Sequence, residues 1–133
     1  MSEAYAEVEA IRRRHVSGNQ SQTGNDVIAL LARHDIRLRQ DDGELRQITL
    51  SIPTSVPDAH VIGLRYEKND GSHSEDLFVV QEGRPIEACY RGSLEHKFPE
   101  YAGTHKQPLP SAIVVGIPVL PTAVNTLSML RPR

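Results

Sequence analysis

The densest group of chemically active side chains in this chain lies between Tyr90 and Lys106. It includes Arg91, Glu95, His96 and His105. Phosphodiester cleavage needs a base that removes a hydroxyl proton, an acid that protonates the leaving oxygen, and a cation that stabilises the phosphorane. Glu95 or His96 could act as the base, His105 as the acid, and Arg91 with Lys97 as the phosphate clamp. The same composition is typical of a solvated loop, so both interpretations stay open.

A second set of residues could line a small-molecule pocket. His60, Tyr66 and Tyr90 combine aromatic rings with polar groups, which is the usual character of such pockets. This set is an alternative binding hypothesis.

Metal binding and thiol chemistry are weaker hypotheses. His60, His73, His96, His105 and Cys89 are possible ligands, but no pair has the close spacing of a zinc site, so we predict no metal and no cofactor. Cys89 stands beside apolar strand residues, and we expect a packed side chain there instead of a nucleophile.

Composition limits the class of protein and of partner. The 133 residues fit a single domain, 1–133, and the formal charge of −2 gives no general attraction to nucleic acid or anionic lipid. We therefore expect nucleic acid only as an RNA substrate, under the hydrolase hypothesis. One cysteine, no visible secretory signal and no apolar run long enough for a membrane favour a cytoplasmic protein without a membrane partner.

Two helices are expected at the N-terminus. A first helix from Ser2 to about Val16 would turn Ala4, Val8, Ile11 and His15 inward, at a spacing of three and four. Its acidic start and basic end, Arg12 to Arg14, suit the helix dipole. A second helix is predicted to begin near Thr23 to Asn25 and to bury Val27, Leu30 and Leu31.

Three turn signals then predict an antiparallel meander. A three-residue loop ending at a left-handed Gly43 would place Ile36 opposite Ile48. His60, Ile62, Leu64 and Tyr66 alternate and would share one face of the next strand. A two-residue turn at Glu82-Gly83 would set Val79 opposite Ile86 and Leu77 opposite Ala88.

The last third of the chain has fewer signals. One helical turn is expected from Ser93 to Phe98, a long loop from Pro99 to Pro110, a strand from Ala112 to Val119, and a helix opened by Pro121-Thr122. The predicted fold class is α+β: two N-terminal helices packed on a curved, mainly antiparallel sheet of five to six strands, with a short C-terminal helix. This order is similar in architecture to cystatin-like ligand-binding domains and to small RNA-cleaving toxins.

Three functional hypotheses follow. The preferred one is a non-catalytic binding or interaction protein that meets a protein partner, or itself as a homodimer, through a sheet face or edge. Leu77 to Val80 and Ala112 to Val119 are apolar on both faces, and the few predicted helical residues leave surface that a second copy could cover. The alternative is a small hydrolase, most plausibly a metal-independent ribonuclease-like toxin, and the third is a small-molecule-binding protein.

Overall fold

The structure is a computed structural model that describes residues 4–15, 20–38, 43–53, 55–56, 58–104, 109 and 112–116. Its elements are α1 (Ala4–His15), α2 (Gln20–Arg33), β1 (Glu44–Ser51), β2 (Ala59–Glu67), β3 (His73–Gln81), β4 (Glu87–Cys89), α3 (Arg91–Lys97), the 3₁₀ helix η1 (Pro99–Tyr101) and β5 (Ala112–Gly116). The strands form one sheet in the order β4-β3-β2-β1-β5, and all its pairings are antiparallel. The α+β class is confirmed.

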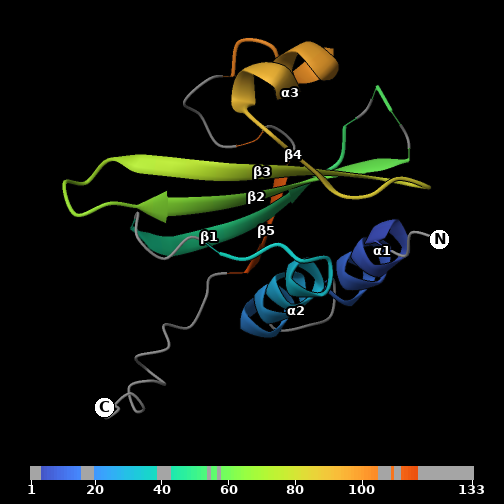
Figure 1. The fold of residues 1–133 in the computed structure, drawn as a ribbon, viewed down its shortest axis with the longest axis horizontal. Coiled ribbons are helices and arrows are strands. Elements are labelled where there is room, and N and C mark those ends of the chain that lie inside the picture. Colours follow the sequence, from blue (N-terminus) through green and yellow to red (C-terminus); the bar gives the residue numbers. More distant parts are fainter. Residues whose placement is uncertain are drawn as a thin grey trace.

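Helices cover the sheet on both faces (Figure 1). On one face lie α1 and α2, which follow each other in the chain and pack together. On the other face lies α3, followed by η1. The molecule therefore has three layers, with the sheet in the middle.

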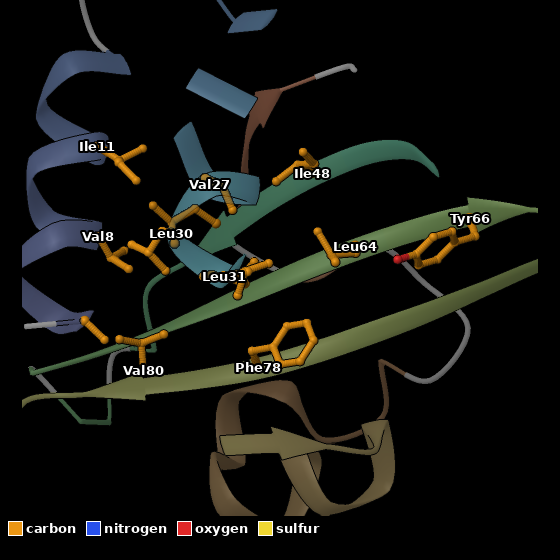
Figure 2. Close-up of a cluster of buried hydrophobic side chains, with 13 residues drawn as sticks. Val8, Ile11, Val27, Leu30, Leu31, Ile48, Leu64, Tyr66, Phe78 and Val80 are labelled. Carbon is orange, nitrogen blue, oxygen red and sulfur yellow. The ribbon is translucent and has the colours of Figure 1, made fainter. Parts of the chain in front are cut away.

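The larger core lies under α1 and α2. The helices contribute Ala4, Val8 and Ile11 from α1 and Val27, Leu30 and Leu31 from α2 (Figure 2). The sheet contributes residues that alternate along its strands: Ile48 and Leu50 from β1, Ile62, Leu64 and Tyr66 from β2, and Phe78 and Val80 from β3. The predicted alternation of β2 is confirmed. Each such side chain stabilises the fold by roughly 1.5–3 kcal/mol through burial.

The smaller core lies on the opposite face. Val61, Leu77 and Val79 point there from β2 and β3, and Leu94, Phe98, Tyr101 and Leu109 cover them. A hydroxyl pair, Ser51 Oγ and Tyr101 Oη, ties η1 to β1 at 2.5 Å. Burial raises the pKa of Tyr101, although its hydrogen bond to Ser51 acts the other way.

The predicted hairpin between residues 36–38 and β1 is wrong. Ile48 lies beside Leu64 of β2 and Gly116 of β5, so β5 takes the edge that was assigned to Ile36. The physical reason is the end of α2, where Asp35 has a φ of 65° and the Ile36 N–H donates to the Leu31 carbonyl. After this cap, Ile36 and Leu38 pack against the core and do not pair with β1.

The predicted pairing of β3 with β4 is wrong by one residue. Cys89 lies opposite Leu77, Ala88 opposite Phe78 and Glu87 opposite Val79. The turn closes with an Arg84 N–H bond to the Gln81 carbonyl, but the chain does not enter β4 until Glu87. The extra residue before β4 changes the register and puts Cys89 on the α3 face.

Other boundaries also differ from those expected. The second helix begins at Gln20, before Thr23, and the single turn expected from Ser93 is a seven-residue helix beginning at Arg91. The loop expected after Pro99 contains η1. The C-terminal helix expected after Pro121 and the end of the strand beyond Gly116 lie outside the described residues. None of the described helices is long and apolar enough to span a membrane.

Candidate functional site

A cleft of about 810 Å³ opens at the sheet edge where β4 ends. It is lined by residues 75–78 of β3, by residues 87–93, which cover β4 and the start of α3, and by Lys97. Its position follows from strand lengths, because β3 extends back to His73 whereas β4 pairs only with Leu77, Phe78 and Val79. After Cys89 the chain leaves the sheet and turns into α3, so the cleft lies between the strand and the helix.

A partly buried ion pair lies in the lining of this cleft. The Arg91 guanidinium contacts both carboxylate oxygens of Glu75, with Nη2 at 3.2 Å from Oε1 and Nε at 3.1 Å from Oε2. Arg91 Nη1 also donates to the Thr104 carbonyl at 2.9 Å. Only 6% of Arg91 is exposed. This fork-like contact attaches α3 and the segment after η1 to β3.

The outer wall is more exposed. Lys97 Nζ lies 3.2 Å from Glu87 Oε1, and both side chains are substantially solvated. Cys89 is half-buried, and burial raises the pKa of its thiol, with Lys97 opposing the effect. The thiol is therefore protonated near neutral pH and is a weak nucleophile, in accord with the packed side chain expected there.

One of the residues that line the cleft is an exposed tyrosine. Tyr90 is 85% exposed. Among the residues that the structure describes, it is the one large hydrophobic side chain that is exposed to solvent. It is placed between the last strand residue, Cys89, and the first helical residue, Arg91. An exposed tyrosine beside a concave surface is typical of a contact residue.

The predicted catalytic residues do not form one site among the described residues. Arg91 lines the cleft, but Glu75 neutralises its charge. Glu95 is half-buried and His96 is exposed on α3, and neither lines the cleft. His105 lies outside the described residues.

The predicted pocket residues are also separated. His60 and Tyr66 lie on the same face of β2 with 1% exposure each, but they are six positions apart, about 20 Å along a strand. Tyr90 belongs to the cleft beyond β3. Within the described ranges, no group of three or more histidine, cysteine or acidic residues could hold a metal ion.

No motif or spacing in the sequence marks Glu75 and Asp76, yet both acidic residues line the cleft. Glu75 could not be paired with Arg91 because the two lie sixteen positions apart on elements whose contact depends on the fold. A signal did exist for a different pair: His60 interrupts an apolar stripe and so required a buried polar partner, which is Glu9 of α1.

The chain matches no protein-family model, and neither the curated proteins nor the solved structures contain a significant match to it.

Proposed function

We propose that this protein is a non-catalytic binding domain, acting in the cytoplasm, which takes an extended segment of a partner protein into the cleft at the end of β4. The observation that carries the proposal is the cleft itself, whose volume of about 810 Å³ falls within the range of natural ligand sites. The cleft combines an apolar floor, an exposed aromatic ring and charged walls.

The covering of both sheet faces favours the edge as the contact surface. Leu77 and Val79 pack against Leu94, Phe98 and Tyr101, and the opposite face of β3 packs against α1 and α2. The apolar side chains of Leu77 to Val80 are therefore covered within one chain and do not require a partner. An interface at the edge does not require either face to be exposed.

An elongated ligand suits the shape of the site. The cleft continues along β3 from Phe78 back to Glu75, past the last residue that pairs with β4. Extended peptides commonly bind along strand edges, where alternate side chains enter pockets. Tyr90 in the lining would then pack on the peptide as an anchor.

The charge of the lining favours a basic segment. Three carboxylates, Glu75, Asp76 and Glu87, line the cleft together with two cations, Arg91 and Lys97. The balance is negative by one charge, which attracts lysine or arginine and repels a phosphodiester backbone. This balance, together with the neutralised Arg91, weighs against the ribonuclease hypothesis.

Selection from a library of random short peptides tests the proposal. We expect the purified protein to enrich basic peptides and to bind them measurably by fluorescence anisotropy. Tyr90→Ala should raise the Kd by about tenfold or more, as the loss of an aromatic anchor does. The matched control is Arg84→Ala, a change at an exposed residue outside the lining, which should leave the Kd unchanged.

Three results would contradict the proposal. They are the absence of enriched peptides, equal binding by Tyr90→Ala, and RNA cleavage that His96→Ala abolishes.

Light scattering shows whether the bound segment comes from another protein or from a second copy of this chain. A wild-type dimer that Tyr90→Ala converts to a monomer would identify the occupant as a second copy of this chain.

A further inference from the structure

A polar contact lies inside the apolar interface that holds α1 on the sheet. His60, in the apolar stripe of β2, has its Nε2 2.6 Å from Glu9 Oε2 of α1. The side chain of His60 is 1% exposed and that of Glu9 is 17% exposed. The interface around them consists of Ala4, Val8 and Ile11, which pack against the sheet.

Other groups on α1 surround this pair. The Tyr5 ring stacks on the His60 imidazole, with the ring centres 5.1 Å apart and the planes at 28°. Arg12 and Arg13 reach the second oxygen of Glu9, at 3.4 Å and 3.8 Å. The carboxylate of Glu9 is thus already shared by two guanidinium groups before His60 carries any charge.

The loops next to the sheet add two carboxylates. Asp58 precedes β2 and Glu82 follows β3, and both are close enough to help raise the pKa of Tyr5, together with burial and Glu9. On the sheet side, His60 lies opposite Val80, which is apolar. The charged groups that act on the imidazole are Glu9, which favours its protonation, and Arg12, which opposes it.

The second ring nitrogen of His60 makes the site sensitive to protons. Nδ1 is buried and has no hydrogen-bond partner among the described residues. The neutral ring, with Nε2–H donating to Glu9, leaves a lone pair at Nδ1, whereas the charged ring would leave a buried N–H without an acceptor. Burial accordingly lowers the pKa of His60, although Glu9 opposes this effect.

We propose that the Glu9–His60 contact makes the docking of α1 acid-sensitive, so that one proton taken up by His60 shifts α1 toward a state released from the sheet. In the released state His60 is hydrated and Nδ1–H finds water. The apolar side chains of β2 and β3 under α1, including Ile62 and Val80, then become accessible.

The direction of the effect follows from proton linkage. His60 has a lower pKa when α1 is docked than when the imidazole is in water. Between these two values only the released state binds the proton, so docking weakens as the pH falls through about 6.5, the ordinary histidine value. Each unit of difference in the pKa changes the released population by at most about tenfold, so acid biases α1 toward release.

Hydrogen exchange of the α1 amides tests the proposal. We compare protection, corrected for the intrinsic exchange rate, at about pH 7.5 and about pH 5.5, on either side of the ordinary histidine pKa. Wild-type protection of α1 should fall severalfold at the lower pH, by at most about tenfold. His60→Gln keeps a donor for Glu9 but cannot be protonated, so its α1 protection should not change. His73→Gln, an exposed matched control, should behave as wild type.

Two results would overturn the proposal: equal wild-type protection of α1 at both pH values, or the same fall in His60→Gln. A titration of the wild-type His60 imidazole by NMR needs no variant and decides the matter if His60→Gln does not fold. The pKa of His60 should lie below the ordinary value, and a pKa at or above it would overturn the proposal.

Discussion

Two glycines show how differently single positions respond to the same change. At Gly63 of β2, an added Cβ would lie 2.8 Å from Thr49 Oγ1 and 3.0 Å from Leu109 Cδ1. At Gly92 of α3, nothing lies within 4 Å of the same atom. The first site is closed by packing on the α3 face, and the second is open to solvent.

Gly63→Ala should destabilise the domain. Both neighbouring side chains would have to move, and such overpacking costs roughly 1–3 kcal/mol. Gly92→Ala is the matched control and should stabilise α3 by up to about 1 kcal/mol, because alanine is the better helix former. Urea unfolding measures both free energies. Equal stability of Gly63→Ala and wild type would contradict the packing described here.

Only some of the residues that line the cleft could be predicted from the sequence. Arg91 was singled out from the sequence, and it lines the cleft, but as the buried half of an ion pair with Glu75. Its partner could not be found because a carboxylate on a distant strand leaves no local pattern. Tyr90 was placed in a pocket with His60, yet the two belong to different parts of the molecule.

At the scale of elements, α2 and β4 show where prediction from local patterns ends. The alternation of β2 and the apolar run of β3 follow from side-chain type and were readable. The partner of β1 was not, because a plausible hairpin before Gly43 competed with a strand from the C-terminal part of the chain. One residue more or less in a turn also shifts the register of the next strand, and the sequence alone does not fix the length of the turn.

The end of α2 offers a direct test. Asp35 adopts a positive φ of 65°, a conformation that costs most L residues about 1–2 kcal/mol and that glycine adopts freely. Asp35→Gly should therefore raise the free energy of unfolding, by up to about 1 kcal/mol. Asp35→Ala, which cannot adopt this φ easily, should lower it. Thermal unfolding of both variants gives the comparison, and the opposite ranking would contradict the cap at Ile36.

At the scale of the whole molecule, the α+β class followed from helices grouped before strands. The third layer was not foreseen, because α3 and η1 are short and contain few apolar residues. Leu94 of α3, Tyr101 of η1 and Phe98 between them nevertheless cover the second face of the sheet. Because helices cover both faces of β3, the accessible surface near this strand is the edge of the sheet at β4.

Attachment of this layer should depend on Arg91 more than on Lys97. Arg91→Met leaves Glu75 without its buried partner and should cost about 2 kcal/mol, less than a fully buried pair because Glu75 is 29% exposed. Lys97→Met removes an exposed pair and should cost at most about 0.5 kcal/mol. Denaturant unfolding compares the two variants. Similar losses in both would mean that the Arg91–Glu75 contact does not hold α3.

The pairing of β1 with β5 has a consequence for synthesis on the ribosome. Ser51 lies beside Ala112, so two neighbours in the sheet are separated by nearly half of the printed sequence. A nascent chain that has already made β1 to β4 must wait for β5 before that margin is closed. Until β5 has been synthesised, this margin of β1 is where a chaperone, or another nascent chain, would make its first contact.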